Sequence, residues 1–220
     1  MDTINSQIKE DSDDSPSLLV PFDYANNLGM TERNLPHWQQ EQVTYFITFR
    51  LADSLPQEKL TQLMTEQENW LRHHKTPYSK EEIKEYTELF NDRIQGWLDA
   101  GHGSCILKDE ALSKTIEDSL LFFKGTRYLL HEWIIMPNHI HILLTPINGF
   151  PLDKIMHSLK SYTANVINKA TGRHGKLWKD ESHDHIIRNL KQFNAINKYI
   201  IMNPIKAGLK SGFRSSSKEE

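Results

Sequence analysis

Cysteine is almost absent from this chain of 220 residues, and its scarcity excludes several kinds of site. Cys105 is the single cysteine, so neither an internal disulfide nor a zinc site built from several cysteines can form. Long apolar runs are missing too, and none approaches the roughly 20 residues that a membrane-spanning helix needs. Residues 1–17 are acidic and polar, unlike a secretory signal. We therefore expect a cytoplasmic protein without a membrane partner.

An overall excess of positive charge is also lacking, since the formal net charge is −3. The charge is nevertheless uneven along the chain. Residues 1–121 contain 11 Lys/Arg against 22 Asp/Glu, whereas residues 122–220 contain 15 against 7. A basic half indicates a polyanionic partner, with an unevenly charged solvated surface as the alternative.

The apolar pattern predicts an α+β fold. Strands are expected over residues 43–51, 105–107, 128–136, 139–144 and 185–188, and helices over residues 109–123, 151–171 and 190–202. The tight Pro137-Asn138 turn predicts a hairpin, and Asn203-Pro204 predicts the end of the last helix. Strands separated by helices indicate an antiparallel sheet with helices on one face, which leaves the other face free to receive a ligand.

One domain with an insertion is expected. Residues 1–20 are predicted to be a disordered tail, residues 21–210 a single domain, and residues 211–220 a polar tail. Residues 57–100 have the period of two amphipathic helices, split near Thr76-Pro77. Nine Asp/Glu lie in this stretch, so we expect an acidic helical insertion that faces solvent rather than nucleic acid.

His139 and His141 flank a single apolar residue inside an apolar run. Side chains alternate between the faces of a strand, so both imidazoles point the same way while Ile140 points into the core. Two adjacent imidazoles can bind one divalent metal, although such a triplet also occurs by chance. Mg²⁺ or Mn²⁺ prefers about six ligands, mostly oxygen, so a further protein ligand should come from elsewhere.

Tyr199 and Asn203 are one helical turn apart and share a helix face. The Asn203 amide oxygen can complete the metal site and hold the phenol beside it. The metal would then polarise a phosphate, and the phenolate would attack it to give a covalent phosphotyrosine. Taken singly, Tyr199 is typical of a core or boundary tyrosine and Asn203 of a helix end. Only their combination with the two histidines supports a site.

The segments MPNHIHIL, LKSYTA, GKLW and YIIMNPIKAGL follow one another from residue 136 to residue 209. Together with residues 35–38 and 45–51, they resemble the REP-associated tyrosine transposases. These are relatives of the small single-tyrosine HUH transposases of bacterial insertion sequences. The resemblance covers roughly residues 35–210.

The resemblance implies a ferredoxin-like, RRM-like fold and a metal-dependent endonuclease and strand transferase acting on single-stranded DNA. The DNA would carry a hairpin, such as a REP-like palindrome, and cleavage would leave a 5′-phosphotyrosine and a free 3′-OH. The resemblance makes Tyr199 the nucleophile, His139 and His141 the metal histidines, and Asn203 the additional ligand. It leaves open whether the protein is a homodimer or acts as a single subunit.

Several other residues are open to more than one interpretation. Tyr162, on the long helix, is a rival nucleophile, but the resemblance favours Tyr199 and a packing or DNA-contacting role for Tyr162. His183-Asp184-His185 departs from the family pattern, in which an aromatic residue and an arginine are common. We expect these two histidines to lie at the surface or contact DNA rather than bind metal.

DNA contacts are expected from the basic half of the chain, because lysine and arginine neutralise phosphates. The candidates are Lys154, Lys160, Lys169, Arg173, Lys176, Lys179 and Arg188. A solvated helix face is the alternative for each of them. Trp178 is a candidate for stacking on an unpaired base, with a core tryptophan at the sheet edge as the alternative.

Two other functions compete with strand transfer. The first is a domesticated protein that binds DNA hairpins without cutting them. The second is a metal-dependent phosphoesterase acting on small substrates, in which Tyr199 would have no role.

Overall fold

The computed structural model of this chain describes residues 29–32, 36–39, 42–75, 78–180 and 182–216. The tail predicted at residues 1–20 and the split predicted near Thr76-Pro77 lie outside the described residues. No helix in the described part of the chain is long and apolar enough to cross a membrane.

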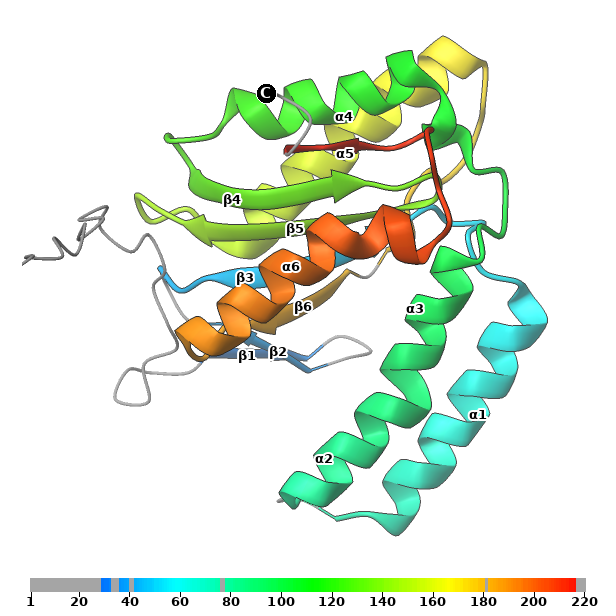
Figure 1. The fold of residues 1–220 in the computed structure, drawn as a ribbon, viewed down its shortest axis with the longest axis vertical. Helices are drawn as coiled ribbons and strands as arrows, with labels where there is room; N and C mark the ends of the chain where they lie inside the picture. Colours follow the sequence, from blue (N-terminus) through cyan, green and yellow to red (C-terminus); the bar gives the residue numbers. More distant parts are fainter. Residues whose placement is uncertain (1–28, 33–35, 40–41, 76–77, 181, 217–220) are drawn as a thin grey trace, which may run out of the picture.

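A five-stranded antiparallel sheet in the order β6-β3-β5-β4-β7 forms the centre of the molecule (Figure 1). The strands are β3 (Tyr45–Arg50), β4 (Tyr128–Ile135), β5 (His139–Pro146), β6 (His183–Ile186) and β7 (Arg214–Ser215). With α4 (Glu110–Phe122) and α5 (Leu152–Thr171), the first four strands follow the β-α-β-β-α-β order of ferredoxin-like folds. The predicted α+β class is therefore confirmed. A separate two-stranded sheet pairs β1 (Gly29–Glu32) with β2 (Pro36–Gln39).

The main core lies between the sheet and the helices α4 and α5. Tyr45, Ile47 and Phe49 alternate along β3 and point into this core, where they meet Ile140 and Ile142 of the adjacent strand β5. Burying such aliphatic and aromatic side chains contributes about 1.5–3 kcal/mol each. The strand period of two consequently sends the intervening residues of β3 and β5 to the opposite face.

The opposite face is covered by α6 (Leu190–Lys206), which runs across the strands (Figure 1). Ile200 of α6 packs with Ile134 of β4 and Leu143 of β5 in a second, smaller core. The prediction of helices on one face is met by α4 and α5. The face that it left free for a ligand instead carries α6, because this helix also has an apolar side to bury.

Pro204 does not end α6, contrary to the sequence-based prediction. The helix continues to Lys206, with Pro204 inside it. Proline lacks the N–H that would bond to the carbonyl of the residue four positions earlier, which usually breaks a helix. Here the Ala207 N–H donates to the Asn203 carbonyl and the Leu209 N–H to the Pro204 carbonyl, so the last turn is retained. Asn203 therefore keeps helical geometry one turn after Tyr199.

The acidic insertion is a helical hairpin that projects from the sheet (Figure 1). Its first arm is α1 (Gln57–His73), and its second is α2 (Lys80–Tyr86), a π-helical turn (Thr87–Asn91) and α3 (Asp92–Asp99). Leu63, Trp70 and Phe90 form a small core between the arms. The two predicted helices are thus present. The prediction that this insertion faces only solvent does not hold for the end of α3, which reaches the candidate site.

The strand predicted at residues 105–107 is absent from the structure. Ile106–Lys108 form a 3₁₀ turn instead, preceded by Cys105 in the left-handed backbone region with φ 49°. Short apolar runs fit a strand or a buried turn equally well, which explains the wrong prediction.

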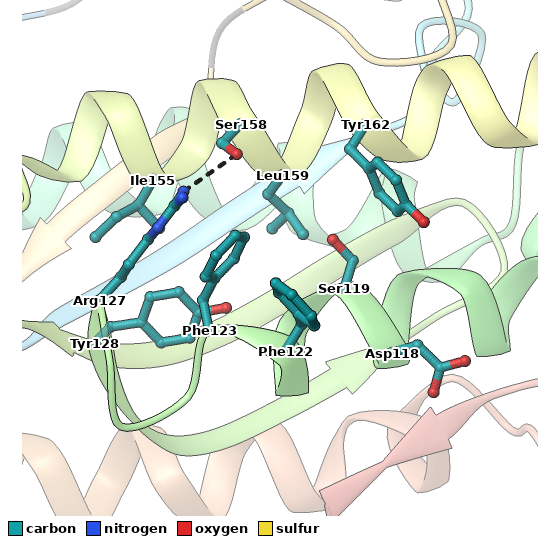
Figure 2. Close-up of a pocket in the computed structure, with 10 residues that line it drawn as sticks. All are labelled: Asp118, Ser119, Phe122, Phe123, Arg127, Tyr128, Ile155, Ser158, Leu159 and Tyr162. Carbon is teal, nitrogen blue, oxygen red and sulfur yellow. Dashed lines mark hydrogen bonds between the residues drawn. The ribbon is translucent and has the colours of Figure 1, made fainter.

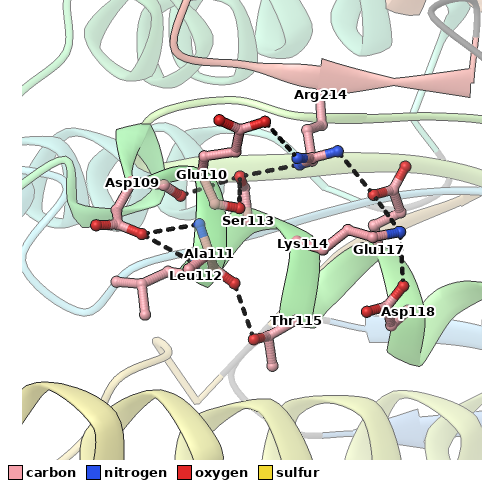
Figure 3. A network of polar contacts seen from close by, with 10 residues as sticks. All are labelled: Asp109, Glu110, Ala111, Leu112, Ser113, Lys114, Thr115, Glu117, Asp118 and Arg214. Atoms are coloured by element: carbon pink, nitrogen blue, oxygen red, sulfur yellow. Dashed lines mark hydrogen bonds and ion pairs between the residues drawn. The ribbon is translucent and has the colours of Figure 1, made fainter.

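The predicted polar tail also contains structure. Arg214 and Ser215 pair with Ile135 and Ile134 as the edge strand β7. Figure 3 shows why this strand is held: the Arg214 guanidinium bonds to Glu117 at 2.9 Å, to Glu110 at 3.1 Å and to Ser113 at 3.2 Å, all on α4. The tail prediction is therefore wrong for these residues, since one arginine fixes them to the fold.

Candidate active site

The face of the sheet beneath α6 contains two neighbouring cross-strand pairs of polar residues. His141 of β5 pairs across the strands with Thr48 of β3, and His139 pairs with Arg50. Both histidines are completely buried, and their ring centroids are 4.8 Å apart. The prediction that the two imidazoles share one face is met by this register.

The hydrogen bonds of His139 indicate which ring nitrogen carries its proton. The Asn138 amide nitrogen donates to the His102 carbonyl at 3.0 Å, which leaves the Asn138 amide oxygen facing His139 Nδ1 at 2.8 Å. An oxygen acceptor there requires Nδ1–H on the imidazole. The lone pair of His139 is therefore on Nε2, a buried atom without a hydrogen-bond partner.

His141 is held in the same tautomer. The Gln95 amide nitrogen approaches His141 Nε2 at 3.3 Å, and the Thr48 hydroxyl lies 2.8 Å from His141 Nδ1. An amide N–H donates, so Nε2 accepts and Nδ1–H donates to Thr48. Orienting partners on Nδ1 are typical of metal-binding histidines, which ligate through the other nitrogen.

Burial keeps both imidazoles neutral. It lowers the pKa of His139 to about 3, and it lowers the pKa of His141 well below its usual value, with the neighbouring histidines adding to the effect. Both rings are thus uncharged in the neutral pH range, which a metal site requires. The Nε2 lone pair of His139 has no partner, whereas that of His141 accepts from Gln95.

Tyr199 lies directly above the histidines. Its ring is 5.4 Å from that of His141 and 6.0 Å from that of Phe46, edge-on to both. The hydroxyl is buried without a hydrogen-bond partner. Burial raises the pKa of the phenol, and the charge of Asp99 raises it further. The Lys206 ammonium lies 5.0 Å from the ring centre, where it can offset negative charge on the phenol.

Asn203 is completely buried one turn after Tyr199, and neither atom of its amide has a hydrogen-bond partner at normal geometry. Its amide is close enough to Asp99 and to Tyr199 to lower the pKa of both. An unpaired buried amide costs about 1–3 kcal/mol, so something must normally satisfy it. A divalent cation fits this need, because Asn203 Oδ1 would supply a hard oxygen ligand beside the two imidazoles. Among the described residues no three His, Cys, Asp or Glu side chains are already gathered as a metal cluster.

The insertion contributes two further side chains that the sequence-based prediction missed. Gln95 and Asp99 are one turn apart on α3, and the Gln95 amide donates to Asp99 Oδ1 at 3.0 Å as well as to His141. Asp99 Oδ1 lies 3.8 Å from His139 Nε2. The two groups do not form an ion pair at neutral pH, because the low pKa of His139 leaves its ring uncharged. A π-helical turn precedes α3, and the sequence-based prediction did not include it.

Tyr162, the rival nucleophile, lies on the other side of the sheet. It is 57% exposed and lines a groove of about 330 Å³ between α4 and α5. Figure 2 shows it facing Phe122 and Ser119 of α4 across this groove. The groove is separated from His139 and His141 by the sheet itself, so Tyr162 cannot share a site with them in this arrangement.

Trp178 is buried, with 5% of its surface exposed. Its indole packs edge-on against Phe49 at 4.9 Å and donates through Nε1 to the Thr163 hydroxyl at 3.0 Å. A base cannot stack on a ring enclosed in this way. The stacking prediction is therefore contradicted, and the alternative of a core tryptophan at the sheet edge is the one the structure supports.

The predicted DNA-binding residues fall into two groups. Lys154, Lys169, Lys179 and Arg188 are exposed, whereas three others have partners within the chain. Lys160 donates to the carbonyls of Lys179 and Asp180, Lys176 pairs with Asp180, and Arg173 lies 3.8 Å from Asp53. Lys160 therefore stabilises the loop before β6, in addition to any contact with DNA.

His183 and His185 belong to β6, at the edge of the sheet. His185 is half-buried beside the Gln192 amide, and burial lowers its pKa to about 4. His183 is exposed, in register with Thr48. Thr48 lies between His183 and His141 in the sheet, and His183 adds to the lowering of the His141 pKa.

Comparisons with known proteins identify the segment that contains these residues. Residues 107–203 match the family described as "Transposase IS200 like". One solved structure with a similar fold is a REP-associated tyrosine transposase bound to a REP hairpin. It has 20% sequence identity and a TM-score of 0.41, over 78% of this chain and 72% of that chain. No curated protein sequence matches the chain significantly.

Proposed function

Residues 107–203 match the IS200-like transposase family, and on that premise we propose a metal-dependent single-stranded DNA endonuclease and strand transferase of the REP-associated tyrosine type. One observation carries the proposal. The buried rings of His139 and His141 lie 4.8 Å apart on the sheet, and Tyr199 of the distant helix α6 packs 5.4 Å from His141, with Asn203 one turn later.

His139, His141 and Asn203 would hold the divalent cation, Mg²⁺ or Mn²⁺. Bound there, the cation would polarise the scissile phosphate and offset its charge. Thr48 and Asn138 keep the two imidazoles in the tautomer that ligates through Nε2. All three ligand side chains are completely buried between the sheet and α6.

Tyr199 would be the nucleophile. Its phenol oxygen attacks phosphorus and forms a Tyr–O–P bond, while the bond from phosphorus to the 3′ oxygen breaks. The phenol proton is released to solvent, and the leaving 3′ oxygen takes up a proton, giving a 5′-phosphotyrosine and a free 3′-OH. Burial disfavours the phenolate before substrate arrives, so Lys206 beside the ring is placed to favour it during attack.

The DNA hairpin is proposed from the order of the four sequence motifs and from the basic second half of the chain. Lys179 is an exposed candidate at the His139 end of the sheet, because its backbone N–H donates to the Arg50 carbonyl and Arg50 pairs with His139. The Lys179 ammonium group, at this end of the sheet, can bind the phosphates that flank the cleaved bond.

Incubation with labelled, hairpin-bearing single-stranded DNA and Mn²⁺ tests the proposal. We expect a covalent adduct that survives denaturation and is absent when Mn²⁺ is chelated. Hairpin binding without any adduct would favour the binding protein that does not cut. Turnover of a small phosphodiester that persists unchanged in Tyr199→Phe would favour the phosphoesterase.

A further inference from the structure

The acidic insertion brings a carboxylate to the two histidines. Asp99 is the last residue of α3, and its Oδ1 lies 3.8 Å from His139 Nε2. In Figure 1 the end of α3 reaches the C-terminal end of α6, where Asn203 and Lys206 lie. The insertion therefore closes one side of the site that the sheet and α6 form.

No proton lies between Asp99 and His139 in the tautomer described above. His139 Nδ1–H donates to Asn138, so Nε2 presents a lone pair, and a carboxylate oxygen also presents lone pairs. Two acceptors thus face each other, and the His139 atom is buried without a hydrogen-bond partner, beside a partly exposed Asp99. Such an arrangement is unfavourable unless a cation lies between the acceptors.

The separation of the two atoms suits a shared cation. Ligand nitrogen and oxygen atoms lie about 2.0–2.2 Å from a small divalent metal, so two ligands of one metal are roughly 3 to 4.3 Å apart. The observed 3.8 Å falls in this interval and is too long for a hydrogen bond. Gln95 fixes Asp99 in this position by donating to Oδ1 at 3.0 Å. The same amide lies 3.3 Å from His141 Nε2 and would have to leave that nitrogen when His141 binds the metal.

We propose that Asp99 is a metal ligand, so that the insertion completes a site of His139, His141, Asn203 and Asp99. The inference rests on the proposed metal-dependent function and extends it to a part of the chain outside the family match, which begins at residue 107. A carboxylate supplies the negatively charged oxygen that Mg²⁺ and Mn²⁺ prefer and that two imidazoles and an amide lack. Gln95 acts as a positioning residue.

Mn²⁺ binding to the full chain without DNA, measured by calorimetry and by the electron paramagnetic resonance of free Mn²⁺, tests the inference. Asp99→Ala should raise the Mn²⁺ dissociation constant at least tenfold, and Asp99→Asn should raise it less, because an amide oxygen still ligates weakly. Glu58→Gln, which changes an exposed acid on α1 of the same insertion, is the matched control and should leave the constant unchanged. Circular dichroism of each metal-free variant checks that it is folded.

The possible failures are distinguishable. If His139→Ala abolishes Mn²⁺ binding while Asp99→Ala stays within twofold of the natural chain, Asp99 is not a ligand and the proposed function stands. If His139→Ala also leaves Mn²⁺ binding unchanged, the metal site itself is wrong and both proposals fail. Loss of cleavage in Asp99→Ala at unchanged Mn²⁺ affinity would likewise overturn the ligand role.

Discussion

The ring of Tyr199 lies 5.4 Å from the ring of His141, although one residue belongs to the last helix and the other to a central strand. This places Tyr199 beside the proposed metal ligands, where its phenol oxygen would be the attacking atom. We expect Tyr199→Phe to form no detectable adduct with hairpin DNA while it still binds the hairpin. Denaturing gels of the reaction with labelled DNA provide the measurement.

Tyr162→Phe is the matched control for this variant. It removes one hydroxyl from a tyrosine on the opposite side of the sheet, in the groove between α4 and α5. Adduct formation should stay within about twofold of the natural chain. Loss of the adduct in Tyr162→Phe together with its survival in Tyr199→Phe would reverse the assignment of the nucleophile.

Most of the central fold could be predicted from the sequence, because it depends on local period and turn chemistry. The alternation along β3 and β5, the Pro137-Asn138 turn and the apolar stripe of α5 each specify an element. The prediction failed where long-range packing decides. Arg214 and Ser215 form an edge strand in a segment whose composition predicts a polar tail. Helix α6 continues through Pro204, where the sequence predicts its end.

The candidate site was only half visible in the sequence. His139, His141, Tyr199 and Asn203 occur in recognisable spacings, and the structure brings them together. Gln95 and Asp99 belong to a stretch whose acidity suggests a solvated surface. Only the packing of the insertion against the end of α6 reveals that these two polar side chains point inward.

Acid should destabilise the protein through its buried histidines. Burial lowers the pKa of His131 to about 4, below its unfolded value near 6.5, so the unfolded chain binds more protons between these values. The free energy of unfolding should therefore fall as pH is lowered from about 6.5 to about 4. His131→Gln should remove up to about 1.4 kcal/mol per pH unit from this dependence.

Urea unfolding at a series of pH values measures the effect. His157→Gln, which changes an exposed histidine on α5, is the matched control. A profile for His131→Gln that coincides with the natural one would contradict the lowered pKa of this half-buried histidine.

Arg214 should stabilise the fold well beyond an ordinary surface ion pair. Its guanidinium bonds at 2.9 Å to Glu117, whose side chain is buried (Figure 3). Arg214→Ala should lower the free energy of unfolding by about 3 kcal/mol, because it leaves a buried carboxylate with Lys114 as its remaining partner. Lys176→Ala breaks an exposed pair with Asp180 and should cost less than about 1 kcal/mol. Equal losses in the two variants would contradict the role assigned to Arg214.

Lys179 should contribute to DNA affinity more than Lys154 does. Lys179 adjoins the end of β3 that pairs with His139, whereas Lys154 is in the first turn of α5, which follows the opposite end of β5. Lys179→Ala should weaken hairpin binding and reduce the slope of log affinity against log salt concentration by about 0.7–0.9. Titrations of labelled hairpin at several salt concentrations measure both slopes. An unchanged slope in Lys179→Ala with a reduced slope in Lys154→Ala would place the DNA elsewhere.

The position of the covalent bond tests the account most directly. Protein incubated with hairpin-bearing single-stranded DNA and Mn²⁺ is digested with nuclease and protease, and the modified peptide is sequenced by mass spectrometry. The account predicts a nucleotide joined through its 5′-phosphate to Tyr199. Attachment to Tyr162 or any other residue, or no attachment while hairpin binding is retained, would contradict it.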